Sequence, residues 1–276
     1  MLDAAGGVAA CQAMCDGLDA LVRDVVVGVP TPSGTAILAT GGWGRRDTAP
    51  YSDVDLLVLT EGPATDEHRA FAEKVLYPLW DSGLEVGHSV RSLAEALDLV
   101  SEDLPTATAL LDARHLAGDP APSEELVRQV PRAILRTGRR GDANAFVAKL
   151  IAEKCSRHAK FGETLYLLEP NLKHGQGALR DLTTGLWAAQ ARWRVRDFAD
   201  LVPIGAATAR QAAALTGARE QLLRIRVALH LAARRRLDQL TFEMQEAIAP
   251  RFYPDARVRE GELRPAVAPA VEELMR

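Results

Sequence analysis

Hydrophobic positions recur in two different periods along the chain, and the change between them divides the sequence. Short apolar runs over residues 35–40 and 54–59, and alternation over residues 84–90, predict three strands. The first two strands should be neighbours, and the third should pair with the strand that carries Asp55. The strand signals end near Leu93.

Spacings of three and four residues predict helices elsewhere. The predicted helices cover residues 1–30, 66–81, 93–117, 123–137, 142–160, 178–197, 206–246 and 266–275. Turn chemistry at Gly118-Asp119-Pro120 marks the change of class. We therefore expect an α+β protein: a small mixed sheet flanked by helices in residues 1–120, followed by an all-α domain in residues 121–276.

The composition is that of a soluble globular protein. The 276 residues are 47% hydrophobic and 25% charged, and no apolar run approaches the roughly 18 residues of a membrane span. The N-terminal residues lack the pattern of a signal peptide, so we expect a cytoplasmic protein without a membrane partner. The formal net charge of -4 argues against a general nucleic-acid-binding function.

The segment GGWGRRDTAPYSDVD, residues 41–55, carries the candidate chemistry. Side chains alternate along a strand, so Asp53 and Asp55 should project to the same side and reach a metal pair together. Two acids entering an apolar strand are costly unless a cation pairs with them. Carboxylates suit Mg²⁺ or Mn²⁺, which neutralise a polyphosphate and align the attacking and leaving oxygens. We predict Asp53 and Asp55 as metal ligands and catalytic residues.

The residues before this pair favour phosphate binding. Gly41, Gly42 and Gly44 follow a strand and should let backbone amides approach a triphosphate. Arg45 is placed to pair with phosphate oxygens, and Ser52 to donate a hydrogen bond beside the metal. Taken singly, a Gly-Gly turn or a solvated Asp-x-Asp is the simpler interpretation. Their combination at this spacing favours a nucleotide site.

The stretch GGWGRRDTAPYSDVDLLVL resembles the signature of the polymerase-β-like nucleotidyltransferases, and among them that of the uridylyltransferases that modify the nitrogen-signalling protein PII. The likeness continues through LWDSGLEVGHSVRSLAEAL, DLPTATALLDARHLAGD, EPNLKHGQGALRDL and LHLAARRRLDQLTFEMQEAIA. The resemblance implies transfer of UMP from UTP to a tyrosine hydroxyl of PII, with Gly41, Gly42, Asp53 and Asp55 as its motif residues. It implies UTP as substrate and PII as acceptor partner.

The sequence departs from this family at several points. Asp47 stands where members typically have Glu, and Trp43 where they have Tyr. Members typically continue into a metal-dependent hydrolase domain and ACT domains, whereas these 276 residues contain no His-Asp dipeptide. The chain is therefore expected to be either the N-terminal portion of a longer protein or a stand-alone transferase with another acceptor.

A third carboxylate is typical of polymerase-β-like sites, and Glu85 is the only acid in the third predicted strand. Glu85 is our candidate catalytic residue there, with an exposed-edge Glu as the alternative. His88 should lie on the opposite face and is interpreted as a structural histidine.

Two basic segments lie in the helical half. The Gly-rich stretch before residue 181 should close over the nucleotide, with Lys173 and Arg180 on phosphate or base. In the alternative interpretation, Arg180 and Asp181 merely pin this loop. The run Arg234–Arg236 is interpreted as a solvated face, with an acceptor-docking or RNA-contacting patch as the alternative.

Three functions stay open at this point. The first is a PII uridylyltransferase. The second is a nucleotidyltransferase that uses another NTP and a protein, RNA or small-molecule acceptor. The third is a non-catalytic nucleotide-binding module.

Overall fold

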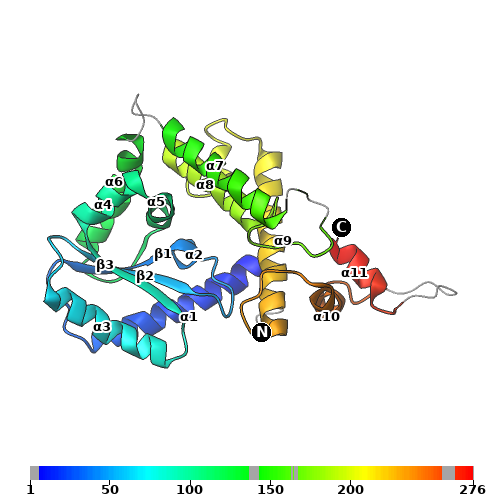
Figure 1. The fold of residues 1–276 in the computed structure, drawn as a ribbon, viewed down its shortest axis with the longest axis horizontal. Helices are drawn as coiled ribbons and strands as arrows, with labels where there is room; N and C mark the ends of the chain where they lie inside the picture. The colour runs from blue at the N-terminus through cyan, green and yellow to red at the C-terminus, as the bar shows by residue number, and fades with distance from the viewer. Residues whose placement is uncertain (1–5, 137–142, 163, 165–166, 257–264, 276) are drawn as a thin grey trace.

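The computed structural model describes residues 6–136, 143–162, 164, 167–256 and 265–275, and Figure 1 shows how its elements are arranged. A sheet flanked by helices forms one end of the molecule, and the later helices extend away from it. The predicted α+β class, a small mixed sheet followed by a helical region, is confirmed. Within the described residues, no helix combines the length and apolarity needed to cross a bilayer.

The sheet consists of β1 (Thr35–Thr40), β2 (Val54–Thr60), β3 (Val86–Ser92) and β4 (Arg114–Gly118), in the spatial order β3-β2-β1-β4. β1 is antiparallel to both β2 and β4, whereas β2 and β3 are parallel. The three predicted strands and their predicted neighbours are therefore confirmed. The parallel pair arises because α3 (Asp66–Asp81) carries the chain back to the starting edge between β2 and β3.

The single helix predicted over residues 93–117 is wrong. The chain forms α4 (Leu93–Glu102), α5 (Leu104–Leu111) and then β4. The side chain of Asp103 accepts a hydrogen bond from Thr106 N and caps α5, which separates the two helices. β4 is short and starts with polar residues, so its strand conformation depends on pairing with β1 rather than on a local pattern.

Helices cover both faces of the sheet, because side chains alternate along its strands. On one face, Leu56 of β2 packs with α1 (Gly7–Val27) and α3. On the other face, Leu57 packs with α4, α5 and α6 (Pro120–Arg136). α6 lies beyond the predicted domain boundary but shares this core with the sheet through Leu126. The division into residues 1–120 and 121–276 stays a prediction.

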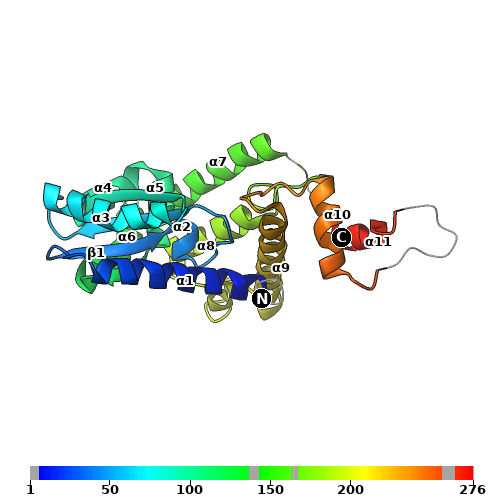
Figure 2. The ribbon, with the colours of Figure 1, turned by 90° about the horizontal axis from the view of Figure 1, so that it is seen from below.

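The remaining elements are helical. They are α7 (Asn144–Phe161), α8 (Leu179–Trp193), the 3₁₀ helix η2 (Phe198–Leu201), α9 (Ala209–Ala233), α10 (Phe242–Phe252) and α11 (Ala268–Met275). α9 packs on α1, where Leu223 meets Cys11, and α10 and α11 lie on the side of α9 away from the sheet (Figure 2). α9 thus brings the helical region against the sheet half.

Two helices end earlier than predicted, in each case at a residue with left-handed backbone conformation. The helix predicted over residues 206–246 is two helices, because Arg234 ends α9 with a φ of 52° and Thr241 caps α10. The helix predicted over residues 178–197 ends at Trp193, where Arg194 has a φ of 58°. The predicted helix ends at 137 and 142 lie outside the described residues.

Candidate active site

A cavity of about 710 Å³ opens where the end of β1 and the starts of β2 and β3 meet α5, α8 and α9. The predicted site residues that line it are Gly41, Gly42, Arg45, Ser52, Asp53, Asp55, Lys173 and Arg180. In the part of the chain that the structure describes, Gly44 and Glu85 do not line this cavity. The fold therefore gathers most of the predicted site from segments far apart in the sequence.

The two predicted metal ligands lie at the entry to β2. Asp53 directly precedes the strand, and Asp55 is its second residue, paired with Thr40 of β1. Asp55 is accessible to solvent, but the surrounding protein raises the pKa of its carboxyl through desolvation, and the charge of Asp53 raises it further. A carboxyl group whose ionisation is disfavoured by desolvation and by a neighbouring carboxylate, as for Asp55, is a setting in which a cation is the natural partner.

Two glycines keep the Asp55 carboxylate uncovered. Gly41 has a φ of 57°, and a Cβ built on it would lie 3.0 Å from Asp55 Oδ2. Gly87, the β3 residue paired with Asp55, would place a Cβ 2.8 Å from Asp55 Oδ1. Any larger side chain at either position would crowd an oxygen that has to stay open for a ligand. The arrangement of Asp53, Asp55, Gly41 and Gly87 therefore fits a divalent cation.

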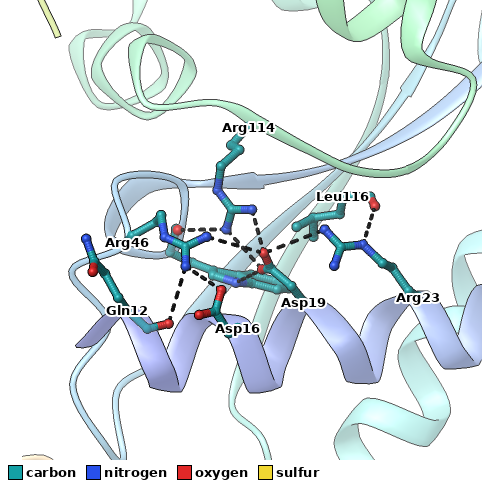
Figure 3. A network of polar contacts seen from close by, with 8 residues as sticks. Gln12, Asp16, Asp19, Arg23, Arg46, Arg114 and Leu116 are labelled. Carbon is teal, nitrogen blue, oxygen red and sulfur yellow. Dashed lines mark hydrogen bonds and ion pairs between the residues drawn. The ribbon is translucent and has the colours of Figure 1, made fainter. Parts of the chain in front are cut away.

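The glycine turn is held in place from behind by a buried polar network. The turn forms the short helix α2 (Gly41–Gly44), whose Trp43 donates from Nε1 to Asp19 Oδ1 at 2.9 Å. Asp19, on α1, also receives two hydrogen bonds from Arg114 of β4, at 2.6 and 2.9 Å (Figure 3). Trp43, one of the two residues expected to depart from the family pattern, thus anchors the turn to α1 through Asp19, and its carbonyl accepts a hydrogen bond from Arg114 of β4.

The other two glycines of the turn occupy different surroundings. A Cβ on Gly42 would meet no atom within 4 Å, so nothing in the protein demands a glycine there. A Cβ on Gly44 would lie 2.1 Å from the carbonyl oxygen of Asp112, which demands a glycine for packing. Gly42 borders the open cavity, whereas Gly44 supports the turn from the inside.

Arg45 follows the turn and forms part of the cavity wall. It hydrogen-bonds to the carboxylates of Asp112 and Asp47, and its guanidinium lies 5.5 Å from the centre of the Trp187 ring. Burial alone would lower the pKa of Arg45, but the charges of Asp112 and Asp47 outweigh burial and raise it. Arg45 is therefore a fixed cation in the wall rather than a free one.

Two cations on the opposite wall have no such partners. Within the described residues, neither the Lys173 ammonium nor the Arg180 guanidinium forms an ion pair or side-chain hydrogen bond. Arg180 lies over the Trp187 ring at 5.2 Å. Burial lowers the pKa of both groups, with nearby positive charges adding to the effect. Cations held this way in a cavity are suited to receiving an anion.

The loop that carries these cations is pinned by Asp181 rather than by Arg180. Asp181 accepts a hydrogen bond from Gly177 N at 2.8 Å and lies 3.0 Å from Arg157 Nη2 and 2.9 Å from His158 Nε2. The sequence left open whether Arg180 faces the nucleotide or pins the loop together with Asp181. Asp181 fixes the loop, and Arg180 points to the cavity.

Glu85 directly precedes β3, and His88 lies within it. Glu85 is exposed, and its backbone carbonyl accepts a hydrogen bond from Val54 N. His88 does line the cavity and meets the Trp80 ring edge-on at 5.7 Å. Among the described residues, no cluster of three or more His, Cys, Asp or Glu side chains could hold a metal. The structure thus leaves the catalytic assignment of Glu85 without a contact to the carboxylate pair.

Two arginines that the sequence analysis did not predict as site residues lie at the cavity or at Asp53. Arg226 of α9 also lines the cavity and donates to Ser52 Oγ at 3.3 Å. Arg236, from the run interpreted as a solvated face, is half exposed and lies 3.0 Å from Asp53 Oδ2. Arg236 lies within the stretch LHLAARRRLDQ, and Arg226 lies three residues before it. This stretch belongs to the family likeness, which is the signal that could have found both residues.

The fold is that of the α+β nucleotidyltransferases, as predicted. Residues 145–271 match the family model described as GlnD PII-uridylyltransferase. The chain is 40% identical over 232 residues to the bifunctional uridylyltransferase/uridylyl-removing enzyme of Bordetella avium, covering 84% of this chain and 26% of that protein. The resemblance to uridylyltransferases is therefore confirmed, and these relatives are nucleotidyltransferase enzymes.

Other relatives with the same description agree. The identity is 42% over 226 residues with the protein of Rhodospirillum rubrum, covering 82% of this chain and 24% of the relative. It is 38% over 246 residues with that of Azospirillum brasilense, covering 87% and 26%. The chain spans about a quarter of the length of the curated relatives it matches.

Proposed function

We propose that this protein transfers UMP from UTP to a tyrosine hydroxyl of a PII-type signalling protein and releases pyrophosphate. The observation that carries the transfer chemistry is the placement of Asp53 and Asp55 in one cavity with Lys173 and Arg180, two cations that form no ion pair within the described part of the chain. The uridylyl group and the PII acceptor are supported by the descriptions of the family model and the relatives.

Asp53 and Asp55 would hold Mg²⁺ or Mn²⁺ together with the substrate phosphates. Mg²⁺ is commonly bound by one or two carboxylates, with phosphate oxygens and water completing its shell. When bound, such an ion supplies positive charge that offsets the triphosphate and lowers the proton affinity of the acceptor hydroxyl. A third protein carboxylate is not required by this arrangement.

The protein's own residues position the triphosphate. Lys173 and Arg180 would contact the β- and γ-phosphates, and Gly42 leaves open space for a phosphate against the backbone. The acceptor oxygen then forms a bond to the α-phosphorus, while the bond to the oxygen bridging the α- and β-phosphates breaks. Pyrophosphate leaves with that oxygen, and the hydroxyl proton passes to solvent. No covalent enzyme intermediate is needed.

The direct test incubates the purified chain with Mg²⁺, a PII protein and UTP labelled at the α-phosphate. We expect label on PII, and a loss of about a thousandfold or more with Asp53→Ala or Asp55→Ala. The exposed Asp255→Asn serves as a matched control with unchanged transfer.

A panel of labelled NTPs and acceptors separates the remaining functions. Transfer from another NTP, or to another protein, RNA or small molecule, would replace the substrate assignment. Nucleotide binding without any turnover would contradict an enzyme and favour a binding module. Full activity in the doubly substituted D53A/D55A protein would overturn the proposed site.

A further inference from the structure

The segment Arg236–Leu240, between α9 and α10, connects the two walls of the cavity. On the sheet side, Asp238 Oδ1 lies 2.7 Å from Arg226 Nε and 3.2 Å from His230 Nε2. Both partners belong to α9 and are nearly inaccessible, with Arg226 5% and His230 0% exposed. Asp238 is therefore the counter-charge that allows a guanidinium to be buried there.

The same two α9 residues hold the turn in front of the carboxylate pair. Arg226 Nη2 donates to Ser52 Oγ at 3.3 Å, and His230 Nδ1 donates to the Pro50 carbonyl at 2.6 Å. Tyr51, between these two anchors, has a φ of 61°, a left-handed conformation that costs free energy for a residue with a side chain. Such a conformation persists only where the surrounding structure fixes it. Here the hydrogen bonds at Pro50 and Ser52 fix it, and Ser52 directly precedes Asp53.

On the other side, the segment pairs with the loop that carries Lys173. Leu172 N donates to the Asp238 carbonyl at 2.8 Å, and Leu240 N donates to the Pro170 carbonyl at 2.9 Å. Asn171 and Gln239 form an antiparallel bridge between these two contacts. Asp238 is thus linked to the Pro50–Asp53 turn through its side-chain contacts with Arg226 and His230, and it contacts the loop that carries Lys173 through its backbone.

We propose that Asp238 is a positioning residue that sets the Pro50–Asp53 turn and the Lys173 loop relative to each other, so that the metal ligands and the phosphate-binding cation face one ligand. Asp238 is not a catalytic residue, because it acts through Arg226 and His230 rather than on the substrate. The effect on UMP transfer rests on the proposed function. The link between the Pro50–Asp53 turn and the Lys173 loop can be measured without turnover.

The experiment compares the wild-type chain with Asp238→Asn by hydrogen exchange, Mn²⁺ binding and kinetics. We expect faster exchange in peptides covering both residues 50–56 and residues 168–176. Because substitutions behind metal ligands typically weaken metal affinity by 10- to 100-fold, we expect the Kd for Mn²⁺ and the KM for UTP each to rise by about tenfold or more. Asp238→Glu should recover part of each loss, and Asp255→Asn should change none.

A second pair of variants keeps the test decisive if Asp238→Asn fails to fold. R226Q/D238N removes both buried charges together, and Ser52→Ala removes one anchor without leaving a buried charge; each should still raise exchange at the turn. Unchanged exchange at either wall in a folded variant would overturn the inference. A wild-type chain without transfer activity would instead contradict the proposed function, and the exchange and Mn²⁺ measurements would still decide the link.

Discussion

Arg236 Nη1 lies 3.0 Å from Asp53 Oδ2, so a guanidinium from the helical half forms an ion pair with one of the two proposed metal ligands. Both side chains are about half exposed, and an ion pair of that kind is weak. A metal ion bound by Asp53 would therefore compete with Arg236 for the same carboxylate oxygen.

Arg236→Gln should therefore strengthen binding of Mn²⁺ in the absence of nucleotide. Since exposed pairs contribute roughly 0–1 kcal/mol, we expect the Kd for Mn²⁺ to fall by about two- to fivefold. Titration calorimetry or Mn²⁺ electron paramagnetic resonance measures it, with the neighbouring exposed Arg235→Gln as control. Weaker Mn²⁺ binding in Arg236→Gln would show that Arg236 supports the site rather than competing for it.

Gly42→Ala should weaken nucleotide binding, whereas Gly44→Ala should destabilise the fold. The Gly42 Cβ would enter open space, so this variant should fold with an unchanged Tm yet bind UTP at least about tenfold more weakly, because the methyl group blocks the approach of a phosphate. Gly44→Ala should lower stability by several kcal/mol or prevent folding, since its Cβ would overlap the Asp112 carbonyl. Thermal unfolding and UTP titration separate the two. Normal UTP affinity in Gly42→Ala would place the triphosphate elsewhere.

Lys173→Met and Arg180→Met should lower nucleotide affinity without lowering stability. Each removes a partly buried cation that forms no ion pair among the described residues, so the substitution leaves no buried counter-charge behind. A charge-assisted contact is worth roughly 1.5–3 kcal/mol, so we expect the KM for UTP to rise by about tenfold or more in each variant. Lys74→Met, on α3 and away from the cavity, is the matched control. An unchanged KM in both variants would remove the loop from the site.

Asp112 gives the protein a pH dependence with a defined sign. Burial raises the pKa of its carboxyl from 3.8 to about 6, despite the opposing effect of Arg45. Between these two values the folded protein binds more protons than the unfolded chain, so the stability contributed by Asp112 rises as the pH falls through 6 and levels off below 4.

The check is urea unfolding of the wild type and Asp112→Asn between pH 7 and 4. The free energy of unfolding of the wild type relative to the variant should increase by about 1–3 kcal/mol as the pH falls. Groups far from Asp112 are the same in both proteins, so their contributions cancel in the difference. A difference that stays constant with pH would contradict the raised pKa.

The sequence by itself predicted the parts of the site that depend on short spacing. The two-residue spacing of Asp53 and Asp55 predicted that both would face one site, and both line the same cavity; the glycine turn before them was evident from Gly41 and Gly42. Local periodicity also predicted three strands and most of the helices, because the burial of one face imposes the same period wherever it occurs. The roles of these residues in metal and phosphate binding remain predictions.

Only the tertiary structure decided what surrounds them. β4 exists because β1 offers it an edge, and Ser52 meets Arg226 across a separation of 174 residues. Asp238 likewise became notable only once α9 had packed against the sheet half. Hydrogen bonds between distant residues leave no period in the sequence, since their partners are chosen by how helices and sheet pack rather than by neighbouring residues.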